Sequence, residues 1–330
     1  MIKNRQLQFS LAINEALDLM MAKDKRVFVI GQGVKSPWYV GNTTRGLLKK
    51  YGEQRIIDTP VSENAITGCG VGAAIAGMRP IIVHPRVDFL MYGLDPIINQ
   101  AANWNYMFGG NAPVPVVFWL IVNRGGEQGA QHSQALHALF SHIPGLKVVM
   151  PSNPYDAKGL LISAIEDNNP VVYIDDRWLY STSCIVPKGI YRVPIGKAVV
   201  SKKGKAITIV ALSCMVKEVL IAANNLEKDG ISAEIIDLRS AKPLDMKTIF
   251  KSVRKTGRLI VVDSGWLTCG LSAEVSAEVS EKLFKYLKLP VQRIALPDLP
   301  APASRTLEKV YYPDFGIIVK VVKQMFKKVK

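Results

Sequence analysis

The chain has 330 residues, of which 48% are hydrophobic and 21% are charged, and its formal net charge is +15. This length suits two domains better than one, and the composition is typical of a globular rather than a disordered protein. The longest apolar run, residues 114–122, is about half the length of a membrane helix. Residues 1–8 contain Lys3 and Arg5 but no unbroken apolar segment. We therefore expect neither a membrane span nor a secretory signal.

The positive charge is concentrated in the second half. Residues 191–330 hold 25 Lys/Arg and 13 Asp/Glu, a net charge of +12. The lysines are spread along expected helices without interleaved aromatic residues, which favours a solvated basic face or an acidic protein partner over nucleic acid. Four widely separated cysteines form no CxxC pair, which favours reduced thiols in a cytoplasmic protein over zinc or disulfides.

Strand-like and helix-like segments alternate along the first half of the chain. Apolar, β-branched runs predict strands at residues 27–30, 55–57, 80–83, 114–122, 147–150 and 171–174. Helical patterns occupy residues 11–21, 44–51, 64–76, 94–107, 133–140 and 156–165. This alternation predicts a mostly parallel sheet with helices on both faces.

A segment rich in Ser, Thr, Pro and Gly at residues 181–192 predicts a linker. Beyond it, strands are expected at residues 206–212, 233–238, 258–262 and 291–296, and helices at residues 216–226, 246–253, 271–283 and 317–326. The sequence therefore predicts an α/β protein with two doubly wound domains, residues 1–190 and residues 191–330.

The sequence DTPVSEN at residues 58–64 leaves a predicted strand and enters a helix of small residues that is rich in glycine. Each glycine inside a helix costs roughly 1 kcal/mol relative to alanine, so we expect another surface to approach this backbone closely. A dinucleotide-binding loop is disfavoured because the glycines lie inside the helix rather than in the turn before it. By itself, Glu63 fits an acidic residue in a first helical turn, where the helix dipole favours it.

Motifs along nearly the whole chain resemble, in order, the beta subunits of pyruvate and branched-chain 2-oxoacid dehydrogenase decarboxylating components. They are RIIDTPVSE at residues 55–63, GMRP at 77–80, QHSQ at 131–134, PGLKVV at 144–149, AIEDNNPV at 164–171, PIGKA at 194–198 and KPLD at 242–245. The resemblance implies a thiamine-diphosphate-dependent enzyme. It also implies a transketolase-like pyrimidine-binding domain followed by a transketolase C-terminal-like domain.

Matched position by position, the resemblance implies that Glu63 bonds the aminopyrimidine ring of thiamine diphosphate and that Val61 and Phe89 contact the cofactor. General acid–base help of the kind a carboxyl group gives there is worth ~10²–10⁴ in rate. His132, at the end of a glycine-rich loop, is the second catalytic candidate. Its alternative role is to cap the helix expected to follow it.

A potassium ion is held in some family members, largely through backbone oxygens, at positions that match Val116, Ala164, Ile165, Asp167 and Asn169. Ordinary helix termination by the sequence DNNP at residues 167–170 explains this segment equally well. Nearby, we expect an ion pair at a strand end in the sequence Asp175-Asp176-Arg177.

The Gly-Asp-Gly motif that opens the Mg²⁺ site of thiamine-diphosphate enzymes is absent from the sequence. The resemblance therefore implies an alpha-type partner subunit that holds Mg²⁺ and the diphosphate, within an α2β2-like assembly. A lipoyl acyltransferase is the expected acyl acceptor, although the +12 second half disfavours docking to a basic module.

A second interpretation is a stand-alone transferase or lyase that uses the same cofactor to form C–C bonds in sugar or secondary metabolism. A non-catalytic binding subunit is disfavoured because Glu63, Phe89 and His132 are all present. Residues 83–88 depart from the family pattern of an acidic residue and extra phenylalanines. There we expect His84 and Arg86 to place positive charge near the substrate, which suits a carboxylate or a larger polar acceptor.

Overall fold

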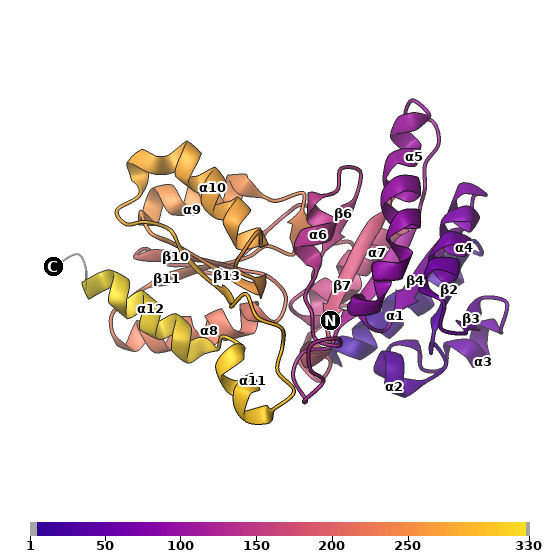
Figure 1. Ribbon diagram of the computed structural model, residues 1–330, viewed down its shortest axis with the longest axis horizontal. Helices are drawn as coiled ribbons and strands as arrows, with labels where there is room; N and C mark the ends of the chain where they lie inside the picture. Colours follow the sequence, from indigo (N-terminus) through magenta and orange to yellow (C-terminus); the bar gives the residue numbers. More distant parts are fainter. Residues whose placement is uncertain (1–4, 328–330) are drawn as a thin grey trace. The chain divides into compact units, whose positions relative to one another are not determined.

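The computed structural model describes residues 5–327, which form two compact units (Figure 1). The first unit comprises the chain up to Arg124 together with His132–Ile195. The second comprises Gly125–Gln131 and the chain from Gly196 onward. Within residues 5–327, no helix is both long enough and apolar enough to cross a membrane.

Six strands of the first unit form a parallel sheet in the order β6-β7-β5-β4-β2-β3. Their bounds are β2 (Val27–Gln32), β3 (Ile56–Thr59), β4 (Arg79–His84), β5 (Val117–Val122), β6 (Lys147–Val149) and β7 (Val171–Asp176). Every residue of β5 and β7 is buried. Both faces of the sheet are covered, which explains why these strands are continuous apolar runs rather than alternating ones.

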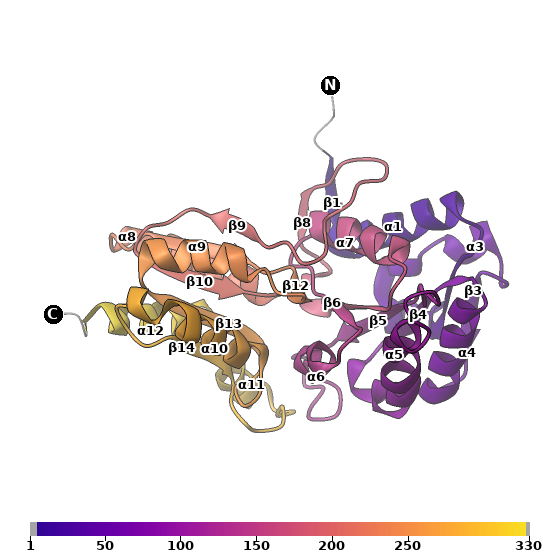
Figure 2. The same cartoon turned by 90° about the horizontal axis from the view of Figure 1, so that it is seen from above.

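Helices cover both faces of this sheet. Figure 2 shows α1, α3 and α7 on one face and α4, α5 and α6 on the other. The helices of the unit are α1 (Phe9–Lys23), α2 (Pro37–Val40), α3 (Leu47–Tyr51), α4 (Glu63–Ile75), α5 (Ala102–Met107), α6 (His137–His142) and α7 (Pro154–Glu166). Single turns and irregular helices complete it: η1 (Gly41–Thr44), η2 (Val87–Gly93), the π-helix η3 (Pro96–Ala101) and η4 (Arg177–Leu179).

Helix α7 begins where local sequence chemistry places its start. The side chain of Asn153 accepts a hydrogen bond of 2.9 Å from the backbone N–H of Asp156, and Pro154 occupies the first helical position. An Asn N-cap followed by proline satisfies one exposed N–H and removes another, which fixes the helix start.

The predicted linker at residues 181–192 contains a strand. In it, β8 (Ser183–Ile185) pairs antiparallel with β1 (Gln6–Gln8). Both strands are three residues long and alternate between exposed and half-buried residues, so neither has a continuous apolar run. The linker prediction was wrong here because the backbone partner comes from the other end of the unit.

Five strands of the second unit form a sheet in the order β14-β13-β10-β11-β9, in which β9 is the antiparallel edge strand. The strands of this sheet are β9 (Val199–Lys202), β10 (Ile207–Ala211), β11 (Ala233–Asp237), β13 (Leu259–Trp266) and β14 (Gln292–Leu296). The short strand β12 (Ser240–Lys242) lies outside it. The helices are α8 (Met215–Lys228), α9 (Met246–Thr256), α10 (Leu271–Leu283), η5 (Phe284–Tyr286), α11 (Arg305–Tyr311) and α12 (Phe315–Lys327). Figure 1 shows α9 and α10 on one face and α8 and α12 on the other.

The end of β7 carries two buried carboxylates with different partners. Asp176 forms an ion pair of 2.9 Å with Arg124, and both side chains are at most 2% exposed. The expected pairing with Arg177 is therefore wrong. The Arg177 guanidinium instead donates to the backbone carbonyls of Trp38 and Tyr39, because the chain turns into η4 after the strand.

The second carboxylate, Asp175, is fully buried and accepts hydrogen bonds from Trp119 (3.2 Å) and Tyr180 (3.1 Å). Burial raises the pKa of Asp175 to about 7, and these two hydrogen bonds oppose the shift only in part. An acid whose pKa is higher in the folded state destabilises the fold increasingly as pH rises from about 4 to about 7. The effect reaches at most roughly 4 kcal/mol.

We predict that Asp175→Asn changes the melting temperature little at pH 5 and raises it at pH 8, because the amide removes a buried charge. Asp24→Asn is the control. Hydrogen bonds with Arg26 lower the pKa of Asp24, so its charge stabilises the fold at high pH. That variant should lose stability at pH 8. Thermal unfolding at both pH values tests the pair, and an equal effect of Asp175→Asn at pH 5 and pH 8 contradicts the prediction.

Candidate active site

A cavity of about 430 Å³ lies where several parallel strands of the first unit end. The residues that line it lie at or after the carboxyl ends of β2, β3, β4 and β5. They are Gln32, Tyr39, Val61, Glu63, His84, Pro85, Arg86, Phe89, Tyr92 and His132. Open α/β sheets bind ligands at this edge, because loops from neighbouring parallel strands converge there.

Glu63 is half-buried and opens α4, as its position before the small-residue helix predicts. The first turn of this helix is held in place from two sides. The Thr67 hydroxyl donates to the Glu63 carbonyl oxygen (2.6 Å) and lies 3.1 Å from Nε2 of His84. A Cβ atom on Gly93, at the end of η2, would come within 2.7 Å of the Thr67 hydroxyl oxygen. Close packing therefore fixes the backbone from which the Glu63 carboxyl group projects.

The close approach expected along the glycine-rich helix occurs at Gly70. A Cβ atom there would lie 2.2 Å from Cδ1 of Ile82 in β4, so this glycine lets α4 pack tightly on its own sheet. Gly72 has open space around it and is exposed, as is Cys69. The contact of this helix face with another subunit stays a prediction.

His132 lies against Phe89. Their rings are edge to face at 90°, with centroids 5.2 Å apart. The backbone N–H of Gln134 donates to Oδ1 of Asp88 (3.0 Å), which fastens the loop around His132 to η2. Helix α6 begins only at His137, with Leu136 as its N-cap residue, so the helix expected from residue 133 starts four residues later. His132 therefore does not cap a helix.

His84 does not carry the positive charge that the sequence led us to expect. Its side chain is 1% exposed, and burial lowers its pKa to about 3, so the imidazole is neutral at physiological pH. Its neighbour Arg86 lines the same cavity and is the residue of this pair that brings positive charge to it.

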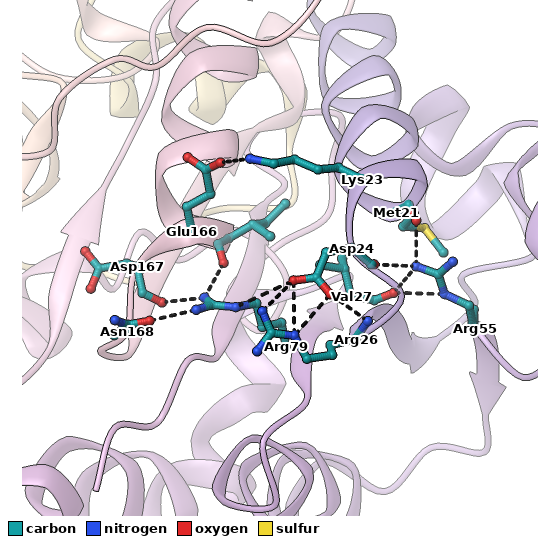
Figure 3. A network of polar contacts seen from close by, with 11 residues as sticks. Met21, Lys23, Asp24, Arg26, Val27, Arg55, Arg79, Glu166, Asp167 and Asn168 are labelled. Atoms are coloured by element: carbon teal, nitrogen blue, oxygen red, sulfur yellow. Dashed lines mark hydrogen bonds and ion pairs between the residues drawn. The ribbon is translucent and has the colours of Figure 1, made fainter. Parts of the chain in front are cut away.

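The residues expected around potassium lie near the end of α7, away from the lining of the cavity. The guanidinium of Arg79 donates to the carbonyl oxygens of Ile165 (2.9 Å) and Asp167 (3.0 Å). Figure 3 shows Arg79 beside Asp167 and Asn168. The carboxylate of Asp167 pairs with Lys147 and accepts from the backbone N–H of Asn169. The carbonyl oxygens of Val116 and Ala164 accept backbone hydrogen bonds from Val171 and Asp167. Charged side chains of the chain itself thus hold this helix end, and a potassium ion here stays a prediction.

We predict that Arg79→Ala lowers the free energy of unfolding by about 2–4 kcal/mol, because it removes several hydrogen bonds from a charged, largely buried group. Arg26→Ala is the matched control, since its side chain is 56% exposed and pairs only locally, with Asp24. The control should change stability far less, because exposed ion pairs contribute little. Chemical denaturation measures both, and equal effects of the two variants contradict the prediction.

Comparisons with known proteins identify the family and the fold of the chain. The transketolase pyrimidine-binding domain matches residues 5–182, and the transketolase C-terminal domain matches residues 196–318. The chain is 45% identical to the acetoin:2,6-dichlorophenolindophenol oxidoreductase subunit beta of Cupriavidus necator, covering 98% of both chains. It is 42% identical to the pyruvate dehydrogenase E1 component subunit beta of Rickettsia bellii, covering 97% of this chain and 98% of that one. A solved split-gene transketolase, described as an inactive beta4 tetramer, shares the fold with a TM-score of 0.78 at 23% identity, covering 96% of this chain and 97% of that one.

The fold and the matched domains define a transketolase-like protein of the thiamine-diphosphate-dependent class. Within that class, the chain belongs to the family of beta subunits of 2-oxoacid and acetoin dehydrogenases. The two-domain α/β architecture and the family expected from the sequence motifs are thereby confirmed.

Proposed function

We propose that this chain forms the aminopyrimidine side of a thiamine diphosphate site in a 2-oxoacid dehydrogenase of the decarboxylating type. One observation carries the proposal: Glu63, Val61, Phe89 and His132 line a single cavity. Relatives that are 42–45% identical over nearly the full chain are named as beta subunits of an acetoin oxidoreductase and of a pyruvate dehydrogenase component, which favours this function over a stand-alone transferase.

The side chains that line the cavity suit a flat, partly polar ring. It offers one carboxyl group beside apolar side chains, of which Val61 is 68% exposed, Tyr92 80% and Phe89 36%. Apolar side chains gathered at a cavity favour a ligand or a second protein that covers them. When bound, thiamine diphosphate supplies the electron sink that decarboxylation needs.

The chain's own residues then have distinct roles. The Glu63 carboxyl group holds a proton at its oxygen and hydrogen-bonds a ring nitrogen of the aminopyrimidine. Phe89 and Val61 pack against the ring and exclude water from it. His132, held beside Phe89, moves a proton at an imidazole nitrogen on the substrate side.

An alpha-type subunit completes the site in this proposal. The sequence has no Gly-Asp-Gly motif, and the relatives are named as beta subunits, so the Mg²⁺ and diphosphate contacts come from a partner chain in an α2β2-like assembly. The acyl group passes to a lipoyl acyltransferase. Residues 1–190 and 191–330 are the proposed functional domains, and a cytoplasmic location stays a prediction.

We predict that Glu63→Gln lowers turnover of the complex with the alpha-type subunit by ~10²–10⁴-fold, because an amide does not hold or release the proton. Steady-state decarboxylation rates measure the loss, and size-exclusion chromatography should show that the complex still forms. The control is Glu53→Gln, which alters a 79% exposed side chain that pairs with Lys35. Unchanged turnover in Glu63→Gln removes this residue from the mechanism.

We also predict that the isolated chain binds thiamine diphosphate with Mg²⁺ weakly, with a dissociation constant above about 100 μM, because half of the contacts are missing. Addition of the alpha-type subunit should tighten binding by at least about 100-fold, or ~2.7 kcal/mol. Isothermal titration calorimetry measures both states. Tight, Mg²⁺-dependent binding to the lone chain contradicts a shared site.

A further inference from the structure

Arg86 lines the candidate active-site cavity with hydrogen-bond donors that no described residue uses. It is half-buried and follows β4, at the extended residue before η2. Its Nη1 donates to the carbonyl oxygen of Pro85, its own neighbour, at 2.8 Å. Its Nε is buried and has no hydrogen-bond partner among residues 5–327. A buried charged donor without a partner is costly, so its presence in a cavity requires an explanation.

Other partly or fully buried arginines of the first unit fasten separate elements together. The guanidinium of Arg55 bonds three backbone carbonyls around the start of β2, and Arg79 bonds the end of α7. Arg124 pairs with Asp176. The Nε of Arg177 is buried without a partner, as in Arg86, but its two Nη atoms bond the carbonyls of Trp38 and Tyr39 in α2. Arg86 joins no two elements in this way. A structural role therefore does not account for its guanidinium.

Charged groups near Arg86 act on it in opposite directions. Burial lowers the pKa of Arg86 most, and repulsion from Arg177 lowers it further, while the attraction of Asp88 is a smaller, opposite effect. Oδ1 of Asp88 accepts from the backbone N–H of Gln134, and its buried Oδ2 has no hydrogen-bond partner among the described residues, so Asp88 does not bond the guanidinium of Arg86. An anion bound at Arg86 would offset both its burial and its repulsion by Arg177.

We propose that Arg86 is a specificity-determining residue that binds a second, non-reacting anionic group on the 2-oxoacid substrate. This inference rests on the proposed function and names its substrate class: 2-oxoacids whose far end is a carboxylate or a phosphate. The planar guanidinium presents paired N–H donors that match either group in a two-bond arrangement.

The group bound by Arg86 is not the carboxylate that leaves. That carboxylate loses its charge as the C–C bond breaks, so an arginine bonded to it stabilises the ground state more than the transition state. A group at the far end of the substrate keeps its charge throughout and contributes binding alone. The strand that precedes Arg86, β4, and the strand that precedes Glu63, β3, are separated by β2, a spacing of about 10 Å.

The test uses the complex of the full chain with its alpha-type subunit and three substrates of similar shape. 2-Oxoglutarate carries a far carboxylate, 2-oxo-4-phosphonobutanoate carries a phosphonate in place of phosphate, and 5-methyl-2-oxohexanoate carries an isopropyl group. The wild-type complex should prefer one of the two anionic substrates to the isopropyl compound, and which one it prefers identifies the group. Arg86→Gln should lower kcat/KM for that substrate by about 10- to 100-fold and change kcat/KM for the isopropyl compound by less than about 3-fold.

Two further variants and a binding measurement make the result decisive. Arg86→Lys keeps the charge without the planar guanidinium, so its loss of kcat/KM for the anionic substrate should lie between those of wild type and Arg86→Gln. If Arg86→Gln does not fold, Arg86→Lys serves as the test variant. Arg192→Gln, at a 55% exposed arginine paired with Glu166, should leave all three rates unchanged. Calorimetry with glutarate or 3-phosphonopropanoate, neither of which reacts, should show binding to the wild-type complex that Arg86→Gln weakens by a similar factor.

The outcomes separate the two proposals. An unchanged ratio between anionic and isopropyl substrates in Arg86→Gln, with unchanged binding of the dianions, overturns the role of Arg86 and leaves the proposed function standing. A wild-type complex that decarboxylates no 2-oxoacid overturns the proposed function, and the calorimetric measurement then decides on Arg86 alone.

Discussion

The parallel pairing of β2 with β3 and β4, and of β4 with β5, is the constraint on which the candidate site depends. In a parallel sheet, all carboxyl ends face one edge, so the loops after these strands meet there. Glu63 follows β3, Phe89 follows β4 and His132 follows β5, although they are far apart in sequence. The register that buries Ile30 against Ile57 and Ile82 thus also sets where these side chains converge.

Tight packing limits the movement of the segments that carry these side chains. Thr67 links the first turn of α4 to the end of β4 through His84, and the close approach at Gly93 holds η2 against the same turn. His84 is neutral because it is buried, so it contributes packing and a hydrogen bond with Thr67 rather than a charge. Supporting contacts of this kind limit the movement of groups that bind or transfer protons.

The cavity has a mixed character that suits one half of a larger site. It holds one carboxylate, one guanidinium and several exposed apolar side chains, among them Val61 and Tyr92. Exposed apolar surface beside polar groups favours a further molecule that covers it. In the proposed assembly, the cofactor and the alpha-type subunit provide that cover. Arg86 then remains the group that distinguishes one substrate from another.

The sequence by itself determined the fold class, the family and most of the regular elements. Strong local signals identified them, such as the continuous apolar run that became β5 and the Asn-Pro start of α7. Motif matches singled out Glu63, Phe89 and His132 as candidates, and the lining of one cavity includes all three.

Only the tertiary structure decided which side chains pair with one another and which of them carry a charge. The pairing of Asp176 with Arg124 rather than with the adjacent Arg177 depends on contacts 52 residues apart, which local sequence does not encode. The neutral state of His84 follows from burial, and the unpartnered Nε of Arg86 is likewise visible only in the packed molecule. Burial is a property of the packed molecule, because the residues that exclude water from a side chain come from distant parts of the chain.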